Sequence, residues 1–288
     1  LLWAIWLLAA PFLQAQSTRY VKANASGANN GTSWANAFVN LQSAINAAAS
    51  GDEIWVAAGT YVPTAYPTGC SGCSTNRDKA FHLKDGVKMY GGFPNTGNPG
   101  MGDRDPDANP TILSGDFNGD DVGFSNNSEN AYHVVFSVED GSATELDGFT
   151  IRGGNANGAG GTTITVEGHL LGKDSGGGMY NAHDAMTIIR ACKFLENWAT
   201  VSGAGMLNSV NSSPSVSDCI FFNNRASISG GGMNNFNGSS PMVVNCTFWG
   251  NEADFGAAVR NHTDSDASYV NCSFSGNDAG ANGGAMRN

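Results

Sequence analysis

Residues 192–199 read CKFLENWA, and the pattern returns as CIFFNNRA at 219–226, CTFWGNEA at 246–253 and CSFSGNDA at 272–279. The period is 27 residues twice and then 26 residues. Such regularity indicates a solenoid, in which each unit buries its apolar face only by stacking on its neighbours. The columns that stay in register are Cys192, Cys219, Cys246 and Cys272; Phe194, Phe221, Phe248 and Phe274; Asn197, Asn224, Asn251 and Asn277; and Ala199, Ala226, Ala253 and Ala279.

A unit of this length accommodates about three short strands and three turns. Cys and Phe are two residues apart, so both side chains face inward on one strand. Stacked units bring equivalent residues to about one strand spacing, ~4.8 Å. A second set of columns follows Gly/Ala-rich steps, and we place both Asn columns at turns, where their amides bond along the stack. These further columns are Met179, Met206, Met233, Val259 and Met286, and Asn181, Asn208, Asn235, Asn261 and Asn288.

Two other repeat architectures fit poorly. An α-solenoid requires apolar residues at helical spacing, which these units lack, and a β-propeller requires blades of about 40 residues. The sequence therefore predicts an all-β protein, a right-handed parallel β-helix. Its composition agrees, because charged residues make up only 14% and the 39 glycines suit many tight turns. The formal charge of −11, without a Lys/Arg cluster, argues against a nucleic-acid partner.

The organisation along the chain divides into four parts. Residues 1–16, LLWAIWLLAAPFLQAQ, form an uncharged run too short to span a membrane, and we interpret them as a front-truncated secretory signal. Residues 17–61 should hold a capping helix and the first coil. Residues 62–175 are irregular coils with long loops, of which 157–175 is the longest. The regular repeats occupy 176–288, where the chain stops at a repeat boundary.

The capping helix is predicted from residue 34 to residue 49. Trp34, Phe38, Leu41 and Ile45 recur at helical spacing, Thr32 or Ser33 is a candidate N-cap, and Gly51 ends the segment. Such a helix covers the open apolar end of the stack, as repeat proteins require.

Two sets of motifs resemble known proteins. FLEN, FFNN, FWGN and FSGN, paired with GGGM, GAGM, GGGM, GAAV and GGAM, resemble the FxxN and GGA-aliphatic repeats of the polymorphic outer membrane proteins. The front segment, GTSWANAF…GDEIWVAAGTYVPT…KDGVKMYGGF…TILSGD, is similar to the start of exported bacterial β-helix proteins of the pectin-lyase-like fold. The resemblance implies secretion or display on the outer surface of a Gram-negative-type bacterium. It also implies a C-terminal anchor or sorting segment, so we expect this chain to be truncated and to associate end to end.

Few residues suggest a metal or a disulfide. Cys70 and Cys73, in TGCSGCST, are candidates for a local disulfide. The ladder cysteines suit a core of small buried thiols better than disulfides, because side chains on parallel strands point alike. Asp116, Asn118, Asp120 and Asp121 read D-x-N-x-D-D, a spacing that suits Ca²⁺, although a solvated acidic turn explains it as well. No other cofactor is indicated.

Catalytic candidates are sparse. Among residues expected to point outward, only Lys193 and Asp218 lie on adjacent coils and carry useful charge. The next outward column contains Phe222 and Trp249, which could stack on sugar rings or pack under a loop. We therefore expect a non-catalytic interaction or adhesion protein whose partner is an extracellular glycan or a host or neighbouring cell surface. The alternative is a polysaccharide lyase or glycoside hydrolase, whose groove would have to lie within 62–175.

Overall fold

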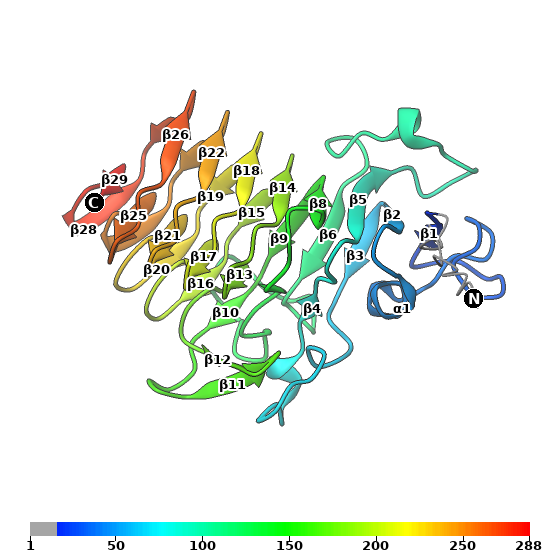
Figure 1. Ribbon diagram of the computed structural model, residues 1–288, viewed down its shortest axis with the longest axis horizontal. Coiled ribbons are helices and arrows are strands. Elements are labelled where there is room, and N and C mark those ends of the chain that lie inside the picture. Colours follow the sequence, from blue (N-terminus) through cyan, green and yellow to red (C-terminus); the bar gives the residue numbers. More distant parts are fainter. Residues whose placement is uncertain (1–15) are drawn as a thin grey trace, which may run out of the picture.

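The computed structural model describes residues 16–288, so all but the last residue of the predicted signal sequence lies outside the described part. The chain winds into a stack of coils, shown in Figure 1 as staggered arrows from the N-terminal to the C-terminal end. Within the four long sheets every strand pairing is parallel. The right-handed parallel β-helix predicted from the repeat is therefore the fold. No described helix is long and apolar enough to cross a membrane.

Each regular coil passes through the four sheets in a fixed order, contributing one short strand to each. Sheet 1 contains β1 (Thr18–Val21), β2 (Glu53–Ala57), β5 (Lys88–Phe93), β8 (Glu145–Asp147), β14 (Ile188–Arg190), β18 (Ser215–Ser217), β22 (Met242–Val244) and β26 (Ser268–Val270). Sheet 2 contains β3 (Gly59–Tyr61), β6 (Thr111–Ser114), β9 (Phe149–Arg152), β15 (Lys193–Leu195), β19 (Ile220–Phe222), β23 (Thr247–Trp249) and β27 (Ser273–Ser275).

The remaining two sheets complete the coil. Sheet 3 contains β10 (Asn155–Ala156), β16 (Trp198–Ala199), β20 (Arg225–Ala226), β24 (Glu252–Phe255) and β28 (Asp278–Asn282). Sheet 4 contains β4 (Phe81–His82), β7 (Val135–Val138), β13 (Met179–Ala182), β17 (Met206–Ser209), β21 (Met233–Phe236), β25 (Val259–His262) and β29 (Met286–Arg287). The prediction of three strands per coil is corrected to four, because strands of two to five residues leave room for another within one repeat.

The core consists of like residues stacked on like. The rings of Phe194, Phe221, Phe248 and Phe274 are nearly parallel, with centroids 4.7, 4.6 and 5.0 Å apart. Phe221 is fully buried, so each inner ring is sandwiched between two others. The spacing is that of neighbouring strands, as the repeat requires.

The two Asn columns differ in position. Asn197, Asn224 and Asn251 lie at the corner after sheet 2, and their amides bond from coil to coil at 3.0 Å. In the second column, Asn181, Asn208 and Asn235 lie within the strands of sheet 4 and are fully buried. The placement of this column at a turn was wrong, because the side chains point into the core and pair there, at 2.8 Å between Asn181 and Asn208.

The capping helix is shorter than predicted. Helix α1 spans Leu41–Ala47, and the Asn40 side chain caps it by accepting the backbone N–H groups of Gln42 and Ser43. Leu41 and Ile45 are buried against the first coils, so the helix does cover that end of the stack. Thr32 and Ser33 are not its caps, since residues 32–36 form turns.

Trp34 belongs to a separate cluster outside the coil. Its ring packs against Tyr20 and Phe93, and its Nε1 donates to the Pro99 carbonyl at 2.8 Å. Residue 34 therefore had helical spacing by coincidence, because its apolar contacts are to the outer face of sheet 1 and not to the core.

The irregular half holds an unpredicted hairpin. Residues 157–175 were expected to be a loop, but β11 (Thr163–Val166) and β12 (His169–Gly172) pair antiparallel and project from the side of the stack (Figure 1). Ile164 and Leu171 are buried against Phe136, which explains why this segment folds back. Short 3₁₀ helices at Asn76–Asp78 and Met101–Asp103 lie in the other long connections.

Candidate functional site

One groove follows the repeat on the outside of sheet 4; we call it the coil groove. It has a volume of about 310 Å³ and extends over four successive coils. Its floor is formed by outward residues of β13, β17, β21 and β25, and its side by the turns that precede these strands. The principal lining residues are Tyr180, Leu207, Ile228, Phe236, Arg260 and Asp174.

The lining of the coil groove suits binding rather than acid–base chemistry. Ile228 and Phe236 are 43% and 36% exposed, so the groove presents apolar surface to solvent. Serine hydroxyls and the Asn234 amide lie among them, while Asp174 is the only carboxyl residue of the lining. A single carboxyl lacks the partner that general acid–base hydrolysis requires.

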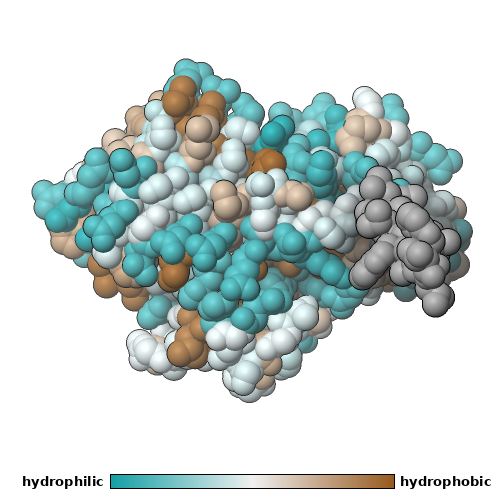
Figure 2. All heavy atoms as spheres, in the orientation of Figure 1, coloured by the Kyte–Doolittle hydropathy of each residue, from teal (hydrophilic) through white to brown (hydrophobic). Residues whose placement is uncertain are grey.

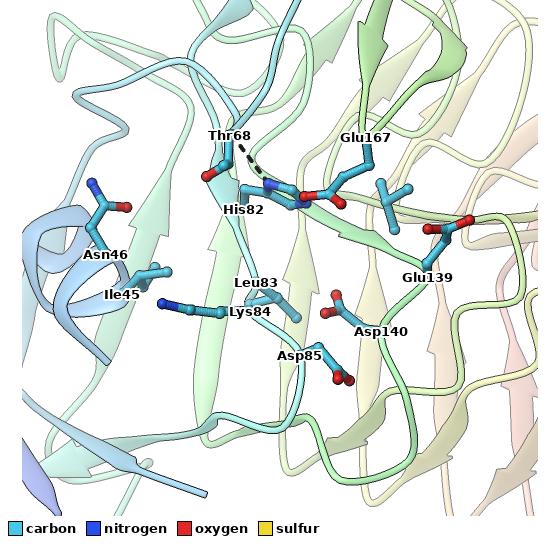
Figure 3. A pocket seen from close by; sticks show the side chains of 11 residues that line it. Ile45, Asn46, Thr68, His82, Leu83, Lys84, Asp85, Glu139, Asp140 and Glu167 are labelled. Carbon is cyan, nitrogen blue, oxygen red and sulfur yellow. Dashed lines mark hydrogen bonds between the residues drawn. The ribbon is translucent and has the colours of Figure 1, made fainter. Parts of the chain in front are cut away.

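A second concave surface, which we call the acidic cleft, is larger, with a volume of about 620 Å³. It lies between the end of α1, strand β4, the turn after β7 and the β11–β12 hairpin (Figure 3). Four of its lining residues are acidic, namely Asp85, Glu139, Asp140 and Glu167. The cleft thus lies in the irregular half, between segments far apart in the sequence.

Asp140 has the most perturbed carboxyl group of the acidic cleft. The residue is 2% exposed, and Ser137 Oγ donates to its Oδ2 at 2.8 Å. Burial, followed by the charges of Asp85 and Glu167, raises the Asp140 pKa to about 7. A carboxyl that holds its proton near neutral pH beside other carboxyls is a candidate general acid.

Three other ionisable groups of the cleft, His82, Lys84 and Asp85, have local partners. The Thr68 backbone N–H donates to His82 Nδ1 at 3.2 Å, and burial lowers the His82 pKa to about 4, so this imidazole is neutral. Lys84 Nζ donates to the Ala48 carbonyl at the end of α1. Asp85 Oδ1 accepts the Gly141 N–H at 2.8 Å. The cleft consequently has a surplus of negative charge.

Sequence reasoning missed these acidic residues, although a signal was present. Strands β4 and β7 pair in sheet 4, and a similar tripeptide follows each of them: Lys84-Asp85-Gly86 after β4 and Glu139-Asp140-Gly141 after β7. Each tripeptide is a charged residue followed by Asp-Gly, so the two corners could have been matched in the sequence. The irregular spacing between them, set by long connections, concealed the equivalence.

The catalytic pair considered from the sequence is not formed. Lys193 Nζ contacts Asp107 Oδ1 at 2.6 Å, across a loop of the irregular half. Asp218 instead accepts a hydrogen bond from Asn245 Nδ2 at 3.2 Å, at a turn before β19. The two residues do lie on adjacent coils, but each has a different partner, so they offer no shared acid–base site.

The aromatic column lies on the open face of sheet 2. Phe222 and Trp249 stack with centroids 4.5 Å apart and planes 18° apart. Trp249 is 52% exposed, so no loop covers it. Because the facing ring surfaces are used against each other, this stack presents largely edges to a ligand. Figure 2 shows further apolar residues over β22 and β26, where Met242 and Val270 are exposed.

The acidic motif in the connection between β6 and β7 forms a compact cluster. Ligand oxygens of Asp116, Asp120, Asp121 and Glu129 all lie within 4.8 Å of one another. Glu129 was not foreseen. Asn118 lies in the same loop, where its backbone N–H donates to Asp116 Oδ1 at 3.1 Å.

The cysteines fall into two classes. Cys70 and Cys73 form a disulfide with a Cα–Cα distance of 6.0 Å, beside the cluster that holds the hairpin. Cys192, Cys219 and Cys246 are buried free thiols, and Cys272 is a half-buried one. The ladder thus supplies small apolar volume and no cross-link.

No protein-family model and no curated protein matches the chain. Among solved structures it is similar to a rhamnogalacturonan lyase, with a TM-score of 0.51 and 17% identity. The match covers 94% of this chain but only 60% of the lyase. At this identity the similarity concerns the fold alone, and that fold carries many activities. The comparison therefore shows a parallel β-helix of the pectin-lyase-like type.

Proposed function

We propose that this protein is a secreted or outer-surface β-helix protein that binds a glycan without cleaving it, in an interaction or adhesion role. The observation that carries the proposal is the coil groove, which runs along the stack with apolar side chains and polar groups interspersed in its lining. Pyranose rings have one apolar face and a rim of hydroxyls, so an extended sugar chain matches such a lining. The Gly/Asn-rich repeat and the uncharged leader-like run support bacterial export and surface display.

The electrostatics favour a neutral glycan. The formal charge of −11 disfavours polyuronates, and the charged groups of the coil groove, Asp174 and Arg260, balance each other. We expect neutral polysaccharides on a bacterial, host or neighbouring cell surface to be the partners.

Glycan-array binding and affinity electrophoresis test this proposal. Phe236→Ala should weaken binding roughly threefold to tenfold, because it removes the more exposed of the two aromatic rings, Tyr180 and Phe236, that line the groove. Trp249→Ala, on another face, is the matched control and should bind as the unchanged protein does. If Trp249→Ala alone weakened binding, the site would be the aromatic column and not the groove.

A second candidate function is glycoside hydrolysis in the acidic cleft. It is favoured by one observation, the buried Asp140 whose pKa is raised to about 7 beside Asp85 and Glu167. In that role Asp140 would protonate the leaving oxygen, while an ionised neighbour would act as base or nucleophile. A bound glycan would then be cut, with activity that falls above about pH 7 as Asp140 loses its proton.

Reducing-end assays on neutral polysaccharides decide between the two functions. Release of reducing ends that is abolished by Asp140→Asn and retained in Asp266→Asn, an exposed acid elsewhere, would establish the hydrolase. Glycan binding without release of reducing or unsaturated ends supports the non-catalytic role.

A further inference from the structure

The connection between β6 and β7 leaves the coil at Gly115 and returns at Asn130, and it is folded around one carboxylate. Asp116 Oδ1 accepts the backbone N–H of Gly119 at 2.6 Å, and its Oδ2 accepts that of Asp121 at 3.1 Å. At the far side of this loop, the Phe124 ring meets the Trp198 ring edge-on, with centroids 5.7 Å apart. The loop therefore lies over the first strands of sheet 3.

Four carboxylates within this loop converge, with little positive charge nearby. The groups are those of Asp116, Asp120, Asp121 and Glu129, all within 4.8 Å of one another. Arg152 is the cation that acts on Asp121, but its guanidinium is engaged with Glu196 at 3.1 Å. Such proximity is unfavourable for ionised carboxylates unless a cation or a shared proton lies between them.

Buried oxygen atoms without donors mark the same place. Asn130 is 1% exposed, and its Nδ2 points to the cluster, donating to Asp121 Oδ2 at 2.7 Å. The Oδ1 of this amide is buried and has no hydrogen-bond partner, and neither have Asp121 Oδ1 and Glu129 Oε1. Buried acceptors are normally satisfied, so three such atoms around four carboxylates point to a missing electrophile.

The chemistry of these groups selects the ion. Every candidate ligand atom of the cluster is a carboxylate oxygen, with no imidazole or thiolate among them. Hard cations prefer such ligands, and Ca²⁺ takes six to eight of them in irregular loops, whereas Mg²⁺ demands near-octahedral geometry and zinc favours nitrogen and sulfur.

We propose that Asp116, Asp120, Asp121 and Glu129, beside the buried Asn130 amide, form a Ca²⁺ site that fastens the 115–130 loop to the coil stack. The ion satisfies the unpartnered oxygens, neutralises the clustered charge and holds Phe124 against Trp198. This site is separate from the coil groove and the acidic cleft, and it stands whether or not either of them binds a glycan.

Calorimetric titration of the EDTA-treated full chain with CaCl₂ tests the site directly. We expect one Ca²⁺ per chain, with a Kd on the order of 10⁻⁴ M, in the range of extracellular modules. The thermal midpoint should rise with added Ca²⁺ and return on chelation. Binding of Mg²⁺ with equal or higher affinity, or no Ca²⁺ binding at millimolar concentration, would overturn the proposal.

Three variants locate the ion. Asp121→Asn and Glu129→Gln should each weaken Ca²⁺ binding at least about tenfold, as loss of one charged ligand does. Asp120→Asn provides the variant least able to disturb folding, because Asp120 is exposed, and it should weaken binding as well. Asp266→Asn is the matched control outside the cluster. Unchanged affinity in a folded Asp120→Asn and Glu129→Gln, judged by circular dichroism, would place the ion elsewhere and refute the site.

Discussion

The two halves of the molecule use the same coil in different ways. In the repeats from residue 176 onward, equivalent residues stack in unbroken columns, as the parallel register of Phe194, Phe221 and Phe248 illustrates. In residues 16–175, long connections interrupt the coils, and they carry the hairpin, the acidic loop and the walls of the acidic cleft.

The irregular half, and not the regular repeats, holds the carboxyl and imidazole groups with the most perturbed pKa values. The two carboxyls and two imidazoles whose pKa values move furthest, those of Asp121, Asp140, His82 and His133, all lie in the irregular half. In each case burial is the largest cause. Regular coils leave their outward side chains in solvent, whereas long connections fold over polar groups and bury them.

The largest effect should follow from breaking the Phe column. Phe221→Ala removes a ring sandwiched between Phe194 and Phe248, and it should cost on the order of 3–5 kcal/mol of unfolding free energy. A urea titration followed by circular dichroism measures the midpoint. An unchanged midpoint would mean that the column does not carry the stability of the repeats.

The Asn ladder should have the next largest effect. Asn224 accepts from Asn197 and donates to Asn251 and to the Phe194 carbonyl, at 2.8–3.0 Å. Asn224→Ala leaves these buried groups unpaired and should cost about 2–3 kcal/mol. Ser227→Ala, an exposed position on the following turn, is the control. Equal midpoints for the two variants would contradict a structural role for the ladder.

The variant Asp140→Asn tests whether burial in the irregular half raises the Asp140 pKa, through the pH dependence of stability. In the folded state Asp140 keeps its proton up to about pH 7, whereas in the unfolded chain it loses the proton near pH 3.8. The free energy of unfolding therefore falls as pH rises between these two values. Relative to the variant, the unchanged protein should lose on the order of 4 kcal/mol between pH 4 and pH 8. His82 and His133, with pKa values lowered to about 4, give the opposite slope in both proteins and cancel in the difference. Parallel stability curves would show that Asp140 titrates normally.

The smallest effect is expected on the open face of sheet 2. Trp249→Ala removes a 52% exposed ring and its stacking on Phe222, so it should cost only about 0.5–1 kcal/mol. The thermal unfolding midpoints of Trp249→Ala and Phe221→Ala compare the stability contributed by the outer aromatic column with that contributed by the inner Phe column. A cost similar to that of Phe221→Ala would mean that the outer column also supports the fold.

Much of the regular half could be predicted from the sequence. Cys192 and Phe194 repeat with the period of one coil, and their two-residue spacing sets them on one face of a strand. Less was predictable where no period exists. The helix begins only after Asn40, which caps it, because the residues before it form bends and turns. The hairpin at 163–172 was hidden in a Gly/Thr-rich stretch.

The sequence by itself determined the parallel stack, because a repeat can bury its inward face only against its own copies and so carries its contacts within its period. Only the tertiary structure decided the acidic cleft and the loop site. Asp85 and Asp140, or Asp121 and Asn130, come together because particular coil corners stack and particular connections fold back over them. Those contacts join segments without a shared period, so their distances depend on the length and packing of each connection.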